Sequence, residues 1–281
     1  MKAFIKVLGL GFLLLLMACA ARAMTVQEAK LLPDTNHVSL TGKVVTYAGT
    51  GFFYIEEDSR SMGIRIDKAG HSLSAGMRAD VEGYIYTDPE SNERYVLADA
   101  AVQSAAPDNT GTVAPVATTI QALGGGDWSV SGTGGQKGIT GARALNNIGL
   151  LVKTGGQFQQ LSATTFTISD GVNTSVECSV PAGTFLSATW QSVQVKGIVS
   201  ICYRGGVYKP LLLIPADGID VVLPTEVVST PGTPAGETGP LVNMSYGYTT
   251  TPSTCSQGHS VEYSFDWGDG TSSPWSTSTT A

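Results

Sequence analysis

Hydrophobic and polar residues alternate along the stretch Lys43–Ile66, and turn-forming residues interrupt the alternation twice. Phe53 and Ile55 share one face of the middle segment. Ile64 and Ile66 share one face of the last segment, after an acidic turn. A period of two, broken at Gly, Asp and Ser, is typical of antiparallel strands with one buried face. The stretch therefore predicts three short strands.

Residues on both sides of this stretch complete a five-stranded unit. Met77–Tyr86 alternates without a break, and Arg94–Val102 supplies a further segment of the same kind. Val26–Leu32 predicts one or two helical turns, which Pro33 stops because it lacks a backbone donor. Five short strands that begin with a meander predict an OB-like barrel, which is a small Greek-key β-barrel.

A second copy of the pattern follows in the second half of the chain. Offsets of 113, 112 and 114 residues separate three pairs of landmarks, namely Phe53 and Phe166, Asp58 and Asp170, and Gly83 and Gly197. So long a period indicates a duplicated domain and not a solenoid. The strands of the second barrel are predicted over residues 148–152, 165–171, 175–180, 192–203 and 207–222.

The remaining segments connect these units. Residues 105–147 are rich in glycine, but they include Trp128, so we expect part of the segment to pack on a neighbouring barrel. Four prolines among residues 224–240 predict a semi-rigid linker. The predicted organisation is an export signal (1–23), a first barrel (24–104), a glycine-rich connection (105–147), a second barrel (148–223), a linker (224–240) and a truncated further module (241–281).

The first 23 residues have the parts of a secretory signal, namely a basic end, an apolar core over Val7–Met17 and a small-residue site at Ala21–Ala23. A rival interpretation is a lipoprotein signal, because Leu16–Cys19 is similar to a bacterial lipobox with Cys19 as the acylated residue. Met17 is unusual at its position, which favours cleavage after Ala23. Both interpretations predict a secreted or cell-surface protein, with membrane attachment only through a lipid on Cys19.

Composition narrows the class of partner. Charged residues make up 14% of the chain and the formal net charge is −7. Without the predicted signal, 13 Lys and Arg stand against 23 Asp and Glu. A protein that tracks phosphates needs a basic surface, so nucleic acid is disfavoured as a partner and a polysaccharide or cell-surface component is favoured.

Three stretches resemble two kinds of known module. Val261–Gly270, VEYSFDWGDG, resembles the strand and turn of PKD and related Ig-like modules in exported bacterial proteins. The segments FFYIEEDSRSMGIRI and FTISDG, with their flanking strands, resemble tandem OB-fold modules of uncharacterised secreted bacterial proteins. The likeness implies an all-β protein with two OB-like barrels and an incomplete Ig-like segment, and it brings no catalytic residues with it.

Motifs for catalysis and cofactors are absent from the sequence, which has no Gly-x-Ser-x-Gly, no His-Glu-x-x-His and no phosphate-binding glycine loop. We therefore predict a non-enzyme without a cofactor. The scattered cysteines and histidines disfavour structural zinc. Asp266 and Asp269 are weak calcium candidates, and shaping of their turn is the favoured role. Glu56 and Glu57 are expected in a solvated turn, on opposite faces.

The outer face of the first barrel carries the candidate ligand-binding residues, because OB-folds bind oligomers over strands 2 and 3 and aromatic rings stack on bases or sugars. These residues are Phe52, Tyr54, Arg65, Tyr84 and Tyr86. The favoured alternative is that the aromatic rings pack against the Trp128 segment or the second barrel.

Three cysteines follow the predicted signal. Cys178 and Cys202 form a candidate disulfide if a bulge brings them close enough. Cys255 would then have no partner cysteine in this chain.

The leading functional hypothesis is a non-catalytic exported modular protein for surface adhesion or display. One alternative is the non-catalytic region of a larger secreted hydrolase. Another is binding of polysaccharide, less so nucleic acid, by the aromatic face of the first barrel.

Overall fold

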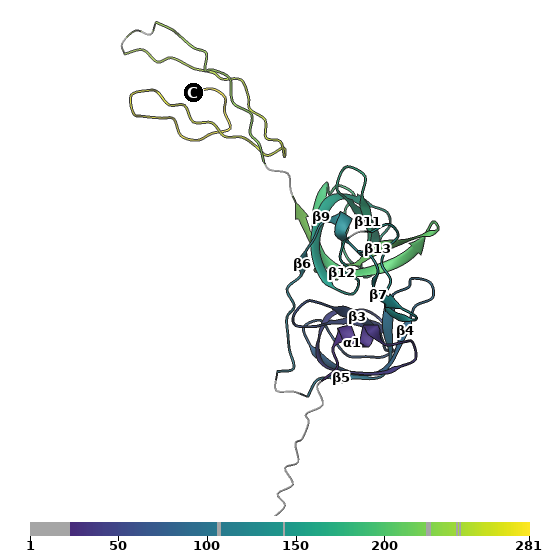
Figure 1. Cartoon of the computed structure of the whole chain (residues 1–281). Coiled ribbons are helices and arrows are strands. Elements are labelled where there is room, and N and C mark those ends of the chain that lie inside the picture. The colour runs from purple at the N-terminus through teal and green to yellow at the C-terminus, as the bar shows by residue number, and fades with distance from the viewer. Residues whose placement is uncertain (1–22, 106–107, 143, 223–225, 240, 242) are drawn as a thin grey trace, which may run out of the picture. The chain divides into compact units, whose positions relative to one another are not determined.

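The computed structural model describes residues 23–105, 108–142, 144–222, 226–239, 241 and 243–281. The predicted export signal, with Cys19, lies outside them apart from Ala23. Internal contacts divide the chain into two units, Met1–Val222 and Leu223–Ala281 (Figure 1). The first unit holds both predicted barrels. The prediction of an all-β fold is confirmed, because strands dominate and α-helix is confined to one short segment of the described residues.

The first barrel is closed, with the strand order β1-β2-β3-β5-β4. Its strands are β1 (His37–Ala48), β2 (Phe52–Glu56), β3 (Gly63–Asp67), β4 (Arg78–Thr87) and β5 (Arg94–Gln103). The strands β3 and β5 are parallel, and β4 pairs with β1 to close the ring. Phe53, Ile55, Ile64 and Ile66 are all buried in its core, as the alternation predicts.

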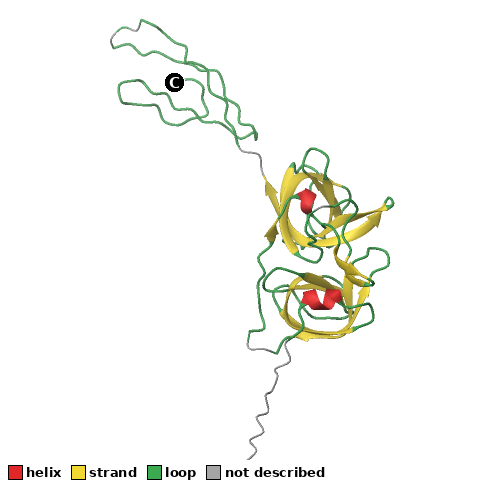
Figure 2. Cartoon of the chain, viewed as in Figure 1, coloured by secondary structure: helices red, strands yellow, loops and turns green. Residues whose placement is uncertain are grey.

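A short helix, α1 (Val26–Leu31), packs against this core (Figure 2). Thr25 caps its first turn by accepting a hydrogen bond from the backbone N–H of Glu28, whose carboxylate accepts one from the Thr25 N–H in return. Val26 and Ala29 are fully buried in the barrel core. The helix therefore covers one opening of the barrel with apolar side chains.

The second barrel repeats the order of the first. Its strands are β9 (Leu151–Gln160), β10 (Thr165–Ser169), β11 (Ser175–Ser179), β12 (Ser192–Arg204) and β13 (Val207–Leu213). Pairing of β12 with β9 closes a ring in the order β9-β10-β11-β13-β12, and β11 and β13 are parallel. The duplication that the offsets indicate is thus present as two matching strand orders.

The expectation of one strand over residues 207–222 is wrong. The strand β13 pairs with β12 and ends at Leu213. The chain then turns, with the Gly218 N–H donating to the Pro215 carbonyl, and a separate strand, β14 (Ile219–Val222), pairs with another part of β12. Pro215 has no N–H to give to a strand ladder, which explains the break.

The glycine-rich connection packs on both barrels. It contains β6 (Val116–Ala117), the 3₁₀ turn η1 (Ile120–Ala122), β7 (Trp128–Ser131) and β8 (Gly134–Gln136). Ile120 and Leu123 are buried in the core of the second barrel, and Trp128 packs against the core of the first. The buried Arg94 holds this connection to β5, because its guanidinium donates to the Thr133 carbonyl.

The second unit lacks the strand expected at the start of Val261–Gly270. Pairing among the described residues from 226 onward is confined to isolated bridges, such as those of Tyr263 with Ser276 and Asp266 with Ser272. Polar residues outnumber apolar ones here, and Phe265 and Ser253 are the described residues of this unit that are buried. Period-two alternation predicted a strand here, and the structure forms isolated bridges in its place.

The two barrels touch through backbone at Gly63 and Gly149. A Cβ atom added to Gly63 would lie 2.1 Å from the Gly149 carbonyl oxygen, and one added to Gly149 would lie 2.4 Å from the Gly63 carbonyl oxygen. Such distances are far below van der Waals contact. Glycine at position 63 therefore sets how closely the barrels approach.

We expect Gly63→Ala to lower the free energy of unfolding by about 1–3 kcal/mol, the usual cost of overpacking. Gly126→Ala is the matched control, because its added Cβ meets its nearest atom at an ordinary 3.4 Å. Urea unfolding followed by circular dichroism measures both. Equal midpoints for the two variants would contradict a tight backbone contact at Gly63.

Candidate functional site

The outer face of β2 lies at the junction of the two barrels. Tyr54 is 1% exposed and packs, together with Tyr47 and Phe52, against Leu151 and Ile198 of the second barrel. The aromatic platform expected on this face is therefore used internally, which corrects the prediction of Tyr54 as a ligand-binding residue. It agrees with the alternative in which the second barrel covers these rings.

A buried carboxylate joins the barrels at the same place. The Tyr54 hydroxyl donates to Glu93 Oε1 at 2.8 Å, and the Ser200 hydroxyl of β12 donates to Glu93 Oε2, also at 2.8 Å. Burial raises the pKa of Glu93, and the two hydroxyl donors act against that shift. Sequence reasoning missed Glu93 and Ser200, since neither belongs to a motif.

Glu56 is also buried, which corrects its expected place in a solvated turn. Its Oε1 accepts a hydrogen bond from the backbone N–H of Leu151, across the junction. Oε2 has no donor at hydrogen-bonding geometry, the hydroxyl of nearby Thr46 included. Burial raises the pKa of Glu56 to about 7. Glu57 instead lies beside Lys43, with 2.9 Å between Oε1 and Nζ.

Lys30 of α1 is the matching buried cation. Its Nζ donates to the Ile148 carbonyl at 3.0 Å, and burial lowers the pKa of Lys30 to about 7. Charges of Glu93 and Glu56 act against that lowering. Lys30, Glu56 and Glu93 therefore hold α1 and the first barrel to the second, by hydrogen bonds in the interior.

A cleft of about 760 Å³ opens beside the junction. Three of the five predicted residues line it, namely Phe52, Arg65 and the almost fully buried Tyr54. Tyr203 and Tyr208 of the β12–β13 hairpin also line it, with ring centroids 4.9 Å apart. The cleft thus has aromatic rings from both barrels.

Arg65 is held in place from several sides. Its Nε and Nη2 donate to the two Asp67 oxygens at 2.7 and 3.0 Å. The guanidinium carbon lies 5.5 Å from the centroid of the Phe52 ring and 5.6 Å from that of Tyr95. A bidentate ion pair and two cation–π contacts satisfy this group, so little of it is free for a ligand.

Tyr84 and Tyr86 do not line the cleft. The Tyr84 ring packs edge-on against His37, with centroids 5.3 Å apart, and Tyr86 stacks on Tyr95 at 5.9 Å. The five predicted residues therefore do not make one continuous platform.

Cys178 and Cys202 are free thiols, so the candidate disulfide is not present. β13 separates their strands, because Cys178 is opposite Leu212 and Cys202 is opposite Lys209 on that strand. Two strand spacings amount to about 9.6 Å, beyond the Cα separation of about 7 Å that a disulfide tolerates. Burial raises the pKa of the Cys178 thiol.

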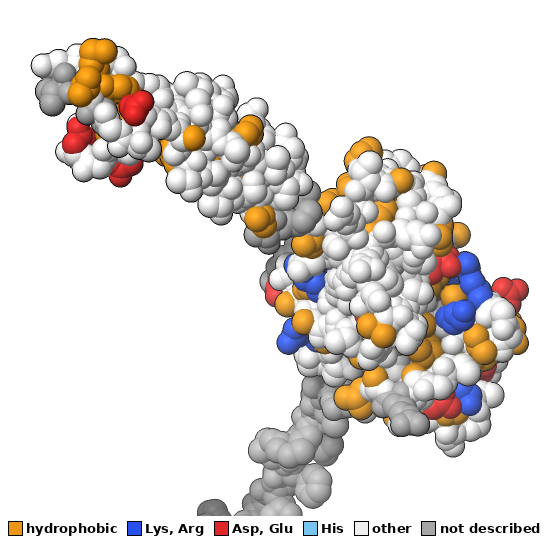
Figure 3. All heavy atoms as spheres, turned by 90° about the horizontal axis from the view of Figure 1, so that it is seen from above, with side chains coloured by type: hydrophobic (Ala, Val, Ile, Leu, Met, Phe, Trp, Pro, Cys, Tyr) orange, Lys and Arg blue, Asp and Glu red, His pale blue; other side chains and the backbone are white. Residues whose placement is uncertain are grey.

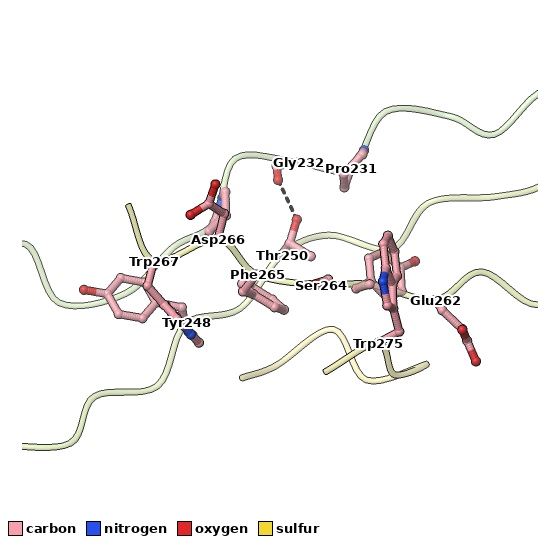
Figure 4. A pocket seen from close by; sticks show the side chains of 12 residues that line it. Pro231, Gly232, Tyr248, Thr250, Glu262, Ser264, Phe265, Asp266, Trp267 and Trp275 are labelled. Carbon is pink, nitrogen blue, oxygen red and sulfur yellow. Dashed lines mark hydrogen bonds between the residues drawn. The ribbon is translucent and has the colours of Figure 1, made fainter. Parts of the chain in front are cut away.

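The second unit contains an aromatic groove of about 670 Å³ (Figure 4). The rings of Phe265 and Trp267 stack at 6.0 Å, and Tyr248 lies 6.1 Å from Trp267. Trp275 lines the other part of the groove and is 71% exposed. The carboxylate residues Glu262 and Asp266 also line it, as Figure 4 shows.

Asp266 and Asp269 form turns with their own backbone. Asp266 Oδ1 accepts from the Gly268 N–H at 2.9 Å, and Asp269 Oδ1 accepts from the Thr271 N–H at 2.8 Å. Hydrogen bonds from the Thr271 hydroxyl and from the Thr271 backbone N–H lower the pKa of Asp269. Both carboxylates fit the role of turn formers that the sequence analysis favoured over calcium binding.

Comparison of the chain with profiles of protein families, with curated proteins and with solved structures gave no match. Among the described residues, no helix has the length and apolar character needed to cross a membrane.

The raised pKa of Glu56 predicts a pH-dependent stability. In the unfolded chain this carboxyl ionises near its ordinary value of 4.5, whereas in the folded protein it holds its proton up to about pH 7. Between these values the folded state binds more protons. The contribution of protonated Glu56 to the free energy of unfolding is therefore fully present below pH 4.5 and is lost as pH rises through about 7.

The Glu56→Gln variant lacks this pH-dependent contribution to stability, because an amide does not titrate. We expect its unfolding free energy, relative to wild type, to rise by about 2–3 kcal/mol from pH 4.5 to pH 8. Urea titrations at several pH values measure the difference. Glu90→Gln, at an exposed position, should follow the wild-type profile. Parallel profiles for Glu56→Gln and wild type would show that Glu56 titrates normally.

Proposed function

We propose that this chain is a non-catalytic exported modular protein, in which the two barrels form one rigid spacer and the second unit carries the surface for contact with other molecules. The junction of the barrels carries this proposal. Its aromatic and ionisable groups, Tyr54, Glu56 and Glu93, are buried and bonded across the two barrels, so they serve cohesion and do not meet a substrate.

Further observations support the proposal. Two closed rings with the same strand order, each with one parallel pair, support the resemblance to tandem OB-fold modules. The basic, apolar and small-residue parts of the first 23 residues support export. An exported protein for adhesion or display needs a spacer that keeps its shape, and a shared buried junction supplies one.

A rigid spacer should unfold as one unit. We expect hydrogen exchange in increasing urea to expose peptides of β4 and of β12 at the same midpoint, because loss of one barrel strips the junction from the other. Gly63→Ala should move both midpoints together. Two separate midpoints would show independent barrels and contradict the spacer.

A second candidate function is polysaccharide binding by the groove of the second unit. The groove combines rings with carboxylates, and stacking of rings on sugars with hydrogen bonds to hydroxyls is the usual chemistry of such sites. Residues 223–281 contain five Asp and Glu and no Lys or Arg, as Figure 3 illustrates for this unit. That charge disfavours nucleic acid.

We expect Trp275→Ala to weaken binding to a neutral polysaccharide at least about fivefold, since one stacking contact is worth about 1 kcal/mol or more. Phe185→Ala is the control, because Phe185 is exposed on the other unit. Affinity electrophoresis against a panel of neutral glucans and mannans gives the comparison. Equal retardation of wild type and Trp275→Ala in every gel that retards the protein, or no retardation in any, would remove this function.

A further inference from the structure

Three metal-ligating side chains meet at the start of the second unit. Cys255 Sγ lies 2.9 Å from Glu226 Oε1, and His259 Nδ1 lies 3.0 Å from the same oxygen. One donor atom from each residue lies within 4.8 Å of the other two. Among the described residues, this is the group of three that meets such a distance limit.

Backbone hydrogen bonds fix the two segments that carry these residues. The Ser229 N–H donates to the Thr254 carbonyl at 3.0 Å, and the Ser256 N–H donates to the Val227 carbonyl at 2.9 Å. The segment that carries Glu226 therefore runs beside the one that carries Cys255, although the two residues are 29 positions apart in sequence.

A tight turn then returns His259 to Cys255. The Gly258 N–H donates to the Cys255 carbonyl at 3.0 Å, and Gly258 has a φ of +77°, which suits glycine. Three residues separate Cys255 from His259, a spacing within the range common for zinc ligands that share one loop. The turn thus brings Cys255 and His259 together, and Glu226 supplies a third donor atom.

The site is open and its sulfur is held in place. The backbone N–H of Gln257 donates to Cys255 Sγ at 3.3 Å and so helps to orient this sulfur toward Glu226. The unit has no Lys or Arg to compete for its anionic groups. The side chains of Glu226 and His259 are 46% and 62% exposed, so an ion and a water ligand reach them freely.

We propose that Glu226, Cys255 and His259 bind one thiophilic divalent cation of the zinc class. Sulfur, imidazole nitrogen and carboxylate oxygen are the three donor types that Zn²⁺ takes in proteins, and water fills the fourth position. On binding, the thiol proton leaves to solvent and a metal–sulfur bond forms in its place. The ion links residue 226 to the loop 255–259 and so stabilises this sparsely hydrogen-bonded unit.

The test is titration of the full chain with Zn²⁺ under reducing conditions, followed by calorimetry, and with Co²⁺, followed by absorption. We expect one ion per chain and, with Co²⁺, a near-ultraviolet charge-transfer band from the thiolate. Cys255→Ala should abolish the band, and both Cys255→Ala and His259→Ala should weaken Zn²⁺ binding at least about tenfold. Saturating Zn²⁺ should also raise the melting temperature of the second unit.

Matched controls come from the first unit. Cys202→Ala removes another accessible thiol, and His37→Ala removes a histidine that also pairs with a carboxylate, Glu82, at 3.3 Å. Both should bind Zn²⁺ as wild type does. Three results would overturn the proposal: no binding, binding that survives Cys255→Ala and His259→Ala, or a charge-transfer band that Cys202→Ala removes. Circular dichroism confirms that each variant is folded.

Discussion

Two carboxylates buried between the barrels hold the first unit together. Each is costly to bury unless hydrogen bonds satisfy it, and both find a donor on the opposite barrel. Glu93 accepts from Ser200, and Glu56 accepts from the backbone of Leu151. If the first barrel stood alone, water would reach Glu56 and Glu93, and burial would no longer raise their pKa values. The junction is therefore part of the fold of each barrel.

Because the junction uses these groups, the contact surface that we propose lies on the second unit. The rings of Tyr47 and Tyr54 are used in the junction, and Arg65 is satisfied by Asp67 and by two aromatic rings. The second unit has the opposite character. Strand pairing among its described residues is limited to isolated bridges, and the exposed Trp275 lines a groove together with two carboxylate residues. We therefore propose that the first unit serves cohesion and the second serves contact, and that a bound cation would order a unit in which the described residues form only isolated bridges.

Local pattern accounted for much of the fold. Alternation located the strands of both barrels, and Pro33 marked the end of the first helix. The offsets revealed the duplication, because side-chain periodicity and turn residues can be identified in the sequence without knowledge of tertiary contacts. The same reasoning failed at residues 207–222, where Pro215 divides one expected strand into two. It also failed within Val261–Gly270, where the expected strand is replaced by isolated bridges.

By itself the sequence determined an all-β chain with a repeated five-stranded pattern, since the period of two requires no knowledge of what each face meets. Only the tertiary structure decided what those faces do. Alternation placed Tyr54 on the outer face correctly, but only the second barrel makes that face an interior. Likewise, Cys255 and His259 show their spacing in the sequence, whereas Glu226 joins them only because the backbone folds back. Burial, and the distance between residues far apart in sequence, depend on how whole elements pack together. Local periodicity carries no information about that packing.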